Sequence, residues 1–324
     1  MGLKKIIKPI LFQGNLKSRN YFEGWYYKQV TEDCKKAISF IPGISLSEND
    51  AHSFILYIYV NKGENNKKNI RTGFLRYPLE AFKYDNVHSS IEIKGNVFSE
   101  SGISVKLSDD DIAIEGELKF GPLTPIKRSI MAPNIMGIFA YIPKMECYHG
   151  IVSMNHKVSG NLSVNGQLLE FDGGSGYIEK DWGISFPEKY VWVQCNNFSR
   201  KDTSIAYSIA DIPFLGRTSP GFFANLIIGN EEYRFATYNS SKFKILEITA
   251  KKIVILFENK TASLHVEAEF DDAGELAAPE QGRMEKTIKE GLSGSVKYRI
   301  YDKIKGISQE DSGQMAGIEI TGQQ

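Results

Sequence analysis

Two acidic residues and a tyrosine alternate along Gly-Tyr-Ile-Glu-Lys-Asp-Trp-Gly, which covers residues 176–183. Tyr177, Glu179 and Asp181 are spaced two residues apart, so their side chains share one face if this segment is a regular strand. Two neighbouring carboxyl groups can share a proton, which raises the pKa of one of them. A carboxyl group that stays protonated near neutral pH is what general acid catalysis needs. The spacing therefore indicates a candidate acid–base site.

A histidine and three tryptophans could complete such a site. His149, within Tyr148-His-Gly, is a candidate for orienting a carboxyl group or accepting a proton. Trp182, Trp192 and Trp25 offer ring faces that stabilise a positive charge or form the wall of a pocket. Tryptophans also serve as ordinary core residues, and Trp25 suits the closed end of a barrel.

Residue type alone leaves other interpretations open. Glu179 and Asp181 could be solvent-exposed charges at the end of a strand, or could pair with Lys180 and Lys189. His149 could equally be a structural histidine whose hydrogen bonds are satisfied in the core.

Other kinds of catalytic site are less well supported. Cys147, His149 and His156 are metal-ligating residue types, but their spacing fits no common zinc pattern, so we predict no metal site. A Cys–His nucleophile needs a third partner that the sequence does not indicate. No Gly-x-Ser-x-Gly nucleophile elbow occurs. Gly173-Gly-Ser-Gly precedes no helix signal, which favours a tight turn over a phosphate-binding loop.

The composition is that of an ordinary globular protein without a strong charge. The chain has 324 residues, with 39 Lys and Arg against 39 Asp and Glu, so it has no general attraction for nucleic acid. Its three cysteines (Cys34, Cys147 and Cys195) match no disulfide framework and indicate reduced thiols. The chain shows no signal-peptide core and no apolar run long enough to span a bilayer. We therefore expect a cytoplasmic protein.

Alternation of apolar and polar residues dominates the chain. Ile112–Phe120 and Ala262–Phe270 alternate strictly, as half-buried strands do, while Ser53–Val60 and Ile253–Phe257 are more continuously apolar. The best helix signal is Gly282–Gly291, with Met284 and Ile288 four residues apart and a glycine as a stop. The pattern predicts an all-β fold of antiparallel barrels or sandwiches with few short helices.

The middle of the chain differs from the rest. The segment from Thr124 to Gly150 contains three prolines and three methionines and fits neither the helical nor the strand period. It is either a long connection packed on the core or a flexible apolar wall over a lipid site, since methionine adapts to irregular shapes.

Aromatic-rich strands open both halves of the chain. Glu23-Gly-Trp-Tyr-Tyr-Lys opens the first β region, and Tyr190-Val-Trp-Val-Gln-Cys opens the second. This similarity suggests two related barrels.

Three blocks of sequence, in this order, resemble the tocopherol cyclase family. They are Met145-Glu-Cys-Tyr-His-Gly, the run from Phe171 to Gly183, and the run from Phe186 to Phe198. Tyr21-Phe-Glu-Gly-Trp-Tyr-Tyr-Lys is similar to the opening motif of that family. More distantly, residues 176–183 are similar to a pattern in carotenoid 1,2-hydratases, a wider group associated with paired lipocalin-like barrels.

The resemblance implies two lipocalin-like antiparallel β-barrels packed together. We expect an N-terminal barrel over residues 1–170, including the connecting segment 124–150, and a C-terminal barrel over residues 171–324.

The resemblance also implies an activity. It is the acid-catalysed cyclisation, or hydration, of the prenyl double bond of a prenylated quinol or another isoprenoid lipid. Such an isomerase-type enzyme changes no oxidation state and needs no cofactor. The alternative is a non-catalytic, lipocalin-like carrier of a hydrophobic isoprenoid ligand. Transient contact with a membrane surface would let either protein collect its lipid.

Roles for individual residues follow from the same resemblance. Glu179 matches the acidic position of the shared pattern and is the first candidate for the acid. The other catalytic candidates are Asp181, His149 and Tyr177. The substrate-binding candidates are Trp182, Trp192, Trp25, Tyr148, Met145 and Phe186.

Overall fold

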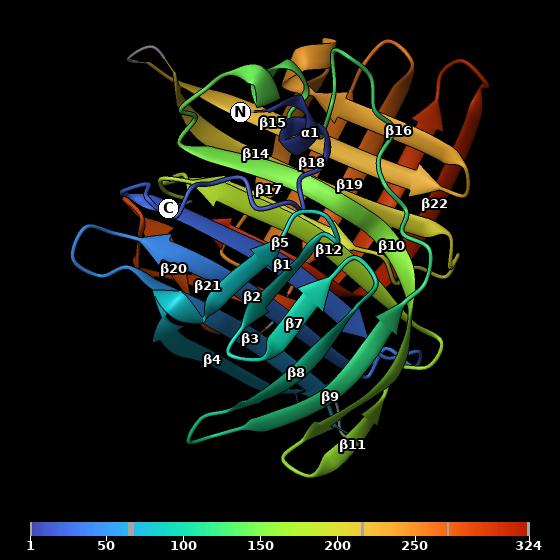
Figure 1. The fold of residues 1–324 in the computed structure, drawn as a ribbon. Helices are drawn as coiled ribbons and strands as arrows, with labels where there is room; N and C mark the ends of the chain where they lie inside the picture. The colour runs from blue at the N-terminus through green and yellow to red at the C-terminus, as the bar shows by residue number, and fades with distance from the viewer. Residues whose placement is uncertain (1, 64–67, 215–216, 271, 323–324) are drawn as a thin grey trace. The chain divides into compact units, whose positions relative to one another are not determined.

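Regular structure in this protein is almost entirely β (Figure 1). The computed structural model describes residues 2–63, 68–214, 217–270 and 272–322. Within them the helices are α1 (Leu3–Ile7) and three short 3₁₀ helices, η1 (Leu79–Ala81), η2 (Gly137–Tyr141) and η3 (Thr237–Asn239). None of the helices in these ranges is both long and apolar enough to cross a membrane.

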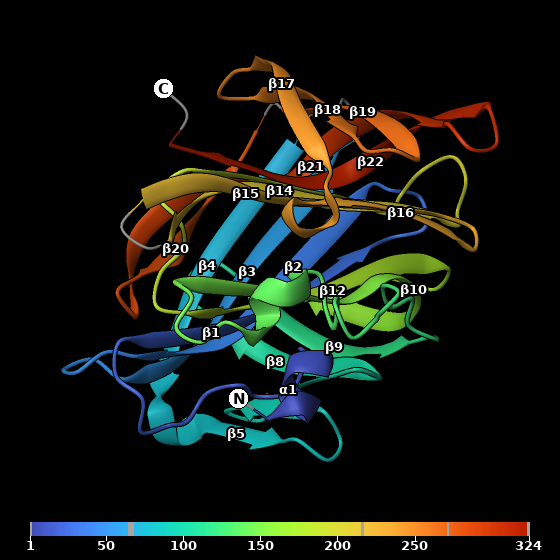
Figure 2. The ribbon, with the colours of Figure 1, turned by 90° about the horizontal axis from the view of Figure 1, so that it is seen from above.

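The first sheet has twelve strands in the described ranges, and their order is β4-β3-β2-β1-β12-β10-β9-β8-β7-β6-β5, with β11 paired to β10. β2, β3 and β4 lie side by side in both Figure 1 and Figure 2. The strands are β1 (Tyr21–Val30), β2 (Lys36–Leu46), β3 (His52–Lys62), β4 (Lys68–Pro78), β5 (Phe82–Asp85), β6 (Ser90–Ile93), β7 (Asn96–Ser99), β8 (Gly102–Ser108), β9 (Ala113–Phe120), β10 (Cys147–Val164), β11 (Gln167–Glu170) and β12 (Gly174–Gly183).

The second sheet has ten strands in the described ranges, and their order is β16-β15-β14-β13-β22-β21-β19-β18-β17, with β20 paired to β21. The strands are β13 (Tyr190–Cys195), β14 (Thr203–Phe214), β15 (Arg217–Ile228), β16 (Glu231–Ala236), β17 (Lys242–Ile248), β18 (Lys252–Glu258), β19 (Ala262–Glu269), β20 (Gly274–Glu280), β21 (Arg283–Asp302) and β22 (Ile307–Thr321).

The two sheets share one strand order. In each sheet, the first four strands along the chain form an antiparallel meander. The first of these four also pairs with the strand of that sheet that comes last along the chain. Thus β1 pairs with β2 and β12, and β13 pairs with β14 and β22. The aromatic-rich segments that suggested a repeat occupy these equivalent first strands.

The first sheet curls around its own apolar core. Strands far apart in the sheet order meet across this core: the rings of Phe40 in β2 and Phe98 in β7 have centroids 6.1 Å apart. Trp25 in β1 and Phe82 in β5 are also 6.1 Å apart. Because these strands are separated by several others, the sheet must close on itself as a barrel does.

The second sheet curls in the same way. The rings of Tyr207 in β14 and Phe257 in β18 lie 5.4 Å apart, and those of Phe222 in β15 and Phe243 in β17 lie 4.9 Å apart. Its core is made of the inward side chains of these strands, such as Val191 and Val193 of β13.

The N-terminal segment packs into the core of the first sheet. The carbonyl of Ile10 accepts a hydrogen bond of 2.7 Å from Nε1 of Trp25. The ring of Phe12 lies 5.5 Å from that of Phe82 and 4.6 Å from that of Tyr84. Trp25 is fully buried beneath this segment, as suits a residue at the end of a barrel.

The chain divides into two compact units. The first consists of Met1–Phe186 with Leu276–Thr287, and the second of Pro187–Glu275 with Ile288–Gln324. This boundary differs from the expected division after residue 170, because β12 is hydrogen-bonded to both β1 and β10 of the first sheet.

The strands expected from alternation correspond to β3, β9, β18 and β19, but the helix predicted over Gly282–Gly291 was wrong. This segment enters β21, where exposure alternates from Arg283 onward. Met284 and Ile288 are four residues apart, and a spacing of four fits the strand period of two as well as one helical turn.

Candidate functional site

β12 brings the acidic candidates together at the centre of the first sheet. It lies between β1 and β10, with Asp181 opposite His149 and Glu179 opposite Tyr26. Tyr177, Glu179 and Asp181 share one face of β12, as their spacing predicted. Cross-strand neighbours on one face lie close enough for direct contact.

An imidazole lies between the two carboxyl groups. Nδ1 of His149 is 2.8 Å from Oδ1 of Asp181, and its Nε2 is 3.3 Å from Oε2 of Glu179. The hydroxyl of Tyr177 donates to Oε2 of Glu179 at 2.5 Å. The side chain of Glu179 is 5% exposed, against 14% for His149 and 23% for Asp181. The structure therefore gathers the four catalytic candidates into one largely buried acid–base cluster, with Asp181 at its more exposed side.

Burial and charge shift the protonation of this cluster. Burial lowers the pKa of His149, but the charges of Asp181 and Glu179 outweigh burial and raise that pKa to about 10. Burial raises the pKa of Asp181, and the neighbouring His149 opposes this rise. Burial, followed by the charge of Glu179, raises the pKa of Tyr177 well above its ordinary value. Near neutral pH, Tyr177 is thus a phenol and His149 an imidazolium.

The positive charge on His149 should make the stability of the protein depend on pH. Because its folded pKa of about 10 exceeds the unfolded value of about 6.5, its contribution is fully present below pH 6.5 and is lost as pH rises through 10. We expect the wild-type protein to lose its stability advantage over His149→Gln across this range. Urea unfolding of both proteins at pH 6.5, 8 and 10 measures the difference. A constant difference would show that His149 does not gain this charge on folding.

The irregular segment before β10 reaches the cluster. Sδ of Met136 accepts a hydrogen bond of 3.2 Å from the backbone N–H of His149. The amide of Asn134 donates to the carbonyl of Ile6 at 3.0 Å, which attaches the segment to α1. Of the expected segment from Thr124 to Gly150, residues 147–150 begin β10, and the part before β10 contains only the short helix η2 as regular structure.

The other face of β12 carries a buried ion pair. Nζ of Lys180 pairs with the carboxylate of Glu23, and both side chains are fully buried. Nζ also donates to the carbonyl of Leu11 at 2.5 Å and lies 4.2 Å from the ring centroid of Trp25. Lys180 therefore faces away from Glu179, so the alternative of a Glu179–Lys180 pair was wrong.

Two tryptophan candidates lie on this opposite face. Lys180 is 5.3 Å from the ring centroid of Trp182, as well as being close to Trp25. Alternation along β12 and β1 thus places both tryptophans away from the acid–base cluster. Neither ring lies on the face of the sheet that carries Glu179.

The remaining substrate-binding candidates are dispersed. Tyr148 stacks on Trp182 with ring centroids 5.5 Å apart, and its hydroxyl accepts a hydrogen bond of 3.1 Å from the backbone N–H of Met145. Phe186 meets Phe22 edge-on at 5.4 Å. Trp192 is a buried residue of β13, in the second unit.

Sequence reasoning missed Tyr26, a second tyrosine on the cluster face beside Tyr177. It is the cross-strand neighbour of Glu179, and its ring lies 6.5 Å from that of Tyr177. Its hydroxyl accepts a hydrogen bond of 3.0 Å from Oγ of Ser39. Tyr26 adjoins Trp25 in the opening motif, and adjacent strand residues face opposite ways, so the alternation along β1 is the signal that distinguishes them.

The cluster also has the residue types of a metal site. His149, Glu179 and Asp181 each offer one ligand atom, and these atoms lie within 4.8 Å of one another. A metal must bind the neutral imidazole, however, and the raised pKa of His149 opposes loss of its proton. Burial, followed by Asp181, raises the pKa of Cys147 well above its ordinary value, which leaves this neighbour a thiol and a poor ligand or nucleophile.

Known proteins share sequence with parts of this chain. Chloroplastic tocopherol cyclases of rice (Oryza sativa subsp. japonica) and maize (Zea mays) are 35% and 31% identical to it over 74 residues. Each match covers 23% of this chain and 16% of the plant protein, so the aligned part is a small fraction of those relatives.

Solved structures share the fold at low sequence identity. Kievitone hydratase from Nectria haematococca matches with a TM-score of 0.53 and 13% identity, over 92% of this chain and 88% of that one. CghA with Sch210972 matches with a TM-score of 0.58 and 9% identity, over 93% and 88%. These matches confirm the predicted fold class, all-β and lipocalin-like with few helices.

A family-level match covers most of the chain, including the whole of the acid–base cluster. The sequence model described as tocopherol cyclase-like matches residues 115–322. The chain belongs to the tocopherol cyclase-like family.

Proposed function

We propose that the protein is a cyclase or hydratase that protonates the prenyl double bond of a prenylated quinol or a related isoprenoid lipid. The observation that carries this proposal is the buried imidazole between Glu179 and Asp181, with Tyr177 hydrogen-bonded to Glu179. Family membership supports the reaction class, and the names of the plant relatives suggest the kind of substrate.

The reaction requires a proton, a cation and a base. A carboxylic acid gives its proton to the less substituted carbon of the alkene, and a tertiary cation forms on the other carbon. The phenol oxygen attacks this cation and loses its own proton, so the product is an isomer of the substrate. In a hydration, water attacks instead. Since no electrons are gained or lost, the chemistry calls for no redox cofactor.

Glu179 is the proposed proton donor: the reacting state is the one in which Glu179 is protonated and Asp181 alone carries the negative charge beside the imidazolium of His149. As its proton leaves, the hydroxyl of Tyr177 and the imidazolium of His149 stabilise the carboxylate that forms. Such donors act most strongly where charge develops in the transition state. Asp181, on the other side of the imidazole, accepts the proton released by the phenol. His149 then gives the proton on Nε2 to Glu179 and regains one from Asp181, which restores all three groups to their starting state.

The cluster favours an enzyme over a carrier. A carrier of an apolar lipid needs only apolar walls, and burying two carboxyl groups beside an imidazole would cost it free energy without improving affinity. An acid catalyst uses this arrangement, because burial favours the protonated form of a carboxyl group, and burial raises the pKa of Asp181.

The segment between β9 and β10 is the proposed route for the lipid. Ile130 is 87% exposed and Met131 67% exposed, while Met136 of the same segment contacts His149. Exposed apolar side chains of this kind suit brief contact with a membrane surface. We infer that the lipid is collected there.

Incubation with a prenylated hydroquinone in deuterated water tests the function. We expect a chromanol that carries one carbon-bound deuterium, because the added proton comes from the acid and hence from solvent. Mass spectrometry detects it. A parallel reaction after extensive chelation should be equally fast, whereas loss of activity that zinc restores would assign His149, Glu179 and Asp181 to a metal instead. Binding without product would support the carrier.

A further inference from the structure

Buried polar atoms without a protein partner gather inside the first barrel. In the part of the chain that the structure describes, Oη of Tyr27, both amide atoms of Gln29 and Nε2 of His156 make no hydrogen bond. Tyr27 and Gln29 are fully buried, and His156 is 4% exposed. Each such atom lowers the stability of the fold unless another group forms a hydrogen bond with it, since burial removes its hydrogen bonds to water.

Strand register places these side chains on one face of three neighbouring strands, β1, β12 and β10. Gln29 on β1 and His156 on β10 are both paired with Gly176 of β12, one on each side. A side chain at Gly176 would collide with His156, because a Cβ there would be 2.2 Å from Nε2. The glycine thus lets the imidazole lie over β12, and Tyr27 lies two residues before Gln29 on the same face of β1.

The hydrogen bonds of Ser153 fix the tautomer of His156. The hydroxyl of Ser153 donates to the carbonyl of Asn155 at 2.9 Å, so its oxygen accepts from Nδ1 of His156 at 3.1 Å. Nδ1 therefore carries the proton, and Nε2 is an acceptor. Burial lowers the pKa of His156 to about 3, which keeps the ring neutral.

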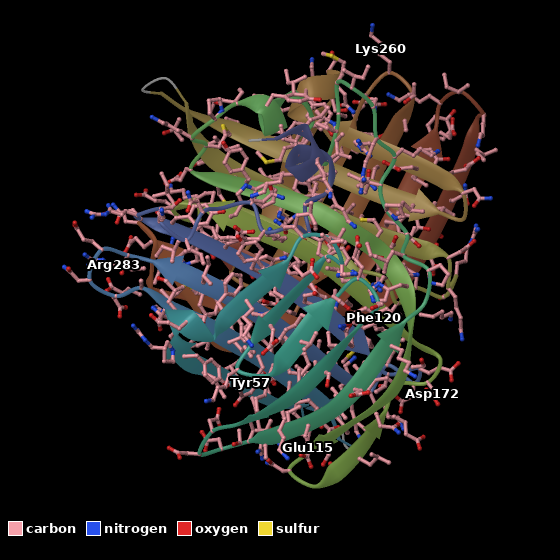
Figure 3. The ribbon with its side chains drawn as sticks, viewed as in Figure 1. Tyr57, Glu115, Phe120, Asp172, Lys260 and Arg283 are labelled. Carbon is pink, nitrogen blue, oxygen red and sulfur yellow. The ribbon has the colours of Figure 1, made fainter. Side chains whose placement is uncertain are left out.

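Aromatic rings form the rest of this cluster. The ring of Phe120 lies between two others, 4.6 Å from His156 and 6.3 Å from Tyr27. The ring of Phe98 lies 5.5 Å from that of Tyr27. Phe120 is the last residue of β9 (Figure 3) and is only half-buried, so one ring of the cluster reaches the protein surface.

We propose that Tyr27, Gln29 and His156 form a second binding site, for a neutral aromatic alcohol of the phenol class. The ligand hydroxyl donates to Nε2 of His156, and its oxygen accepts from the amide of Gln29. The ring lies among Tyr27 and Phe120. A neutral ligand is required, because none of these side chains carries a charge. The site faces the interior of the barrel, opposite the acid–base cluster, and does not depend on the proposed reaction.

Nitrogen NMR of protein labelled with ¹⁵N-histidine, titrated with phenol and with toluene, tests the site. We expect phenol to shift the Nε2 resonance of His156 in a saturable way, because this atom gains a hydrogen bond. Toluene, which lacks the hydroxyl, should leave the resonance in place. His156→Phe identifies the signal. If phenol does not shift the Nε2 resonance, or if phenol and toluene shift it equally, the proposal is overturned.

Calorimetry provides a second readout with matched variants. Phenol should bind roughly tenfold more tightly than toluene, which is the value of one hydrogen bond. His156→Phe should remove this preference and leave turnover of the prenylated hydroquinone intact. Glu179→Gln should keep the preference for phenol and remove most of the turnover. Gly176→Ala, which displaces the imidazole, should also remove the preference. A preference that survives in His156→Phe and Gly176→Ala contradicts the site, whatever the outcome for turnover.

Discussion

Glu179→Gln should lower turnover of a prenylated hydroquinone by roughly 10³-fold, the usual value of a general acid. The amide has the shape of the carboxyl group and can still accept the hydrogen bond from Tyr177, so packing and lipid affinity should change little. Only the transferable proton is removed. The loss should therefore appear in kcat and leave KM nearly unchanged. Steady-state kinetics and lipid binding by the same preparation measure both.

An exposed glutamate provides the matched control for this variant. Glu170 of β11 lies at the surface, so Glu170→Gln makes the same chemical change far from the cluster. We expect it to behave as the wild type. If Glu179→Gln keeps full turnover, Glu179 is not the acid, and Asp181→Asn becomes the variant to examine. If both glutamate variants lose activity together, the effect is not specific to the cluster.

Glu23→Gln should lower the free energy of unfolding by about 3–5 kcal/mol, because it leaves the charge of Lys180 buried without its partner. Burial lowers the pKa of Lys180 to about 8, and the carboxylate of Glu23 opposes this shift. Glu23 also accepts hydrogen bonds from the N–H groups of Gln13 and Gly14, at 2.8 and 2.9 Å, and from Tyr21 at 2.5 Å. Urea unfolding followed by tryptophan fluorescence measures the loss.

Two comparisons separate the ion pair from general packing. The double variant Glu23→Gln, Lys180→Met removes both charges and should recover part of the stability lost in the single variant. Glu258→Gln disrupts the solvent-exposed pair with Lys303 and should have a much smaller effect. Equal losses of unfolding free energy in Glu23→Gln and Glu258→Gln would mean that the buried ion pair contributes no more to stability than the exposed pair.

Alternation predicted the face of the site but not its partners across the sheet. Tyr177, Glu179 and Asp181 share a face because side chains alternate along any regular strand. The position of His149 depends on the pairing of β10 with β12, where Asp181 meets a residue 32 positions earlier. Register of this kind is set by the complete sheet, so the sequence offered His149 as a candidate without its distance.

The dependence on sheet pairing also explains why Trp25 and Trp182, expected beside the acidic residues, lie on the opposite face of the sheet. Trp25 and Tyr26 are adjacent in one motif, and the side chains of adjacent strand residues point to opposite faces. A tryptophan ring stabilises a cation better than a tyrosine ring does, so residue type alone favoured Trp25 over Tyr26 as a substrate-binding candidate. Its place is fixed instead by the N-terminal segment, through the hydrogen bond to Ile10. Nothing in the local pattern reveals which segment will cover a given face.

The strand order has a consequence for synthesis on the ribosome. β1 emerges early and can pair with β2, but its other edge has no partner until β12 has been made, some 150 residues later. Pairings between distant segments form slowly, and an open strand edge invites association with other chains. Since β12 also carries Glu179 and Asp181, the residues of the proposed acid–base site are synthesised together with the strand that joins β1 to β10, within the same ten residues.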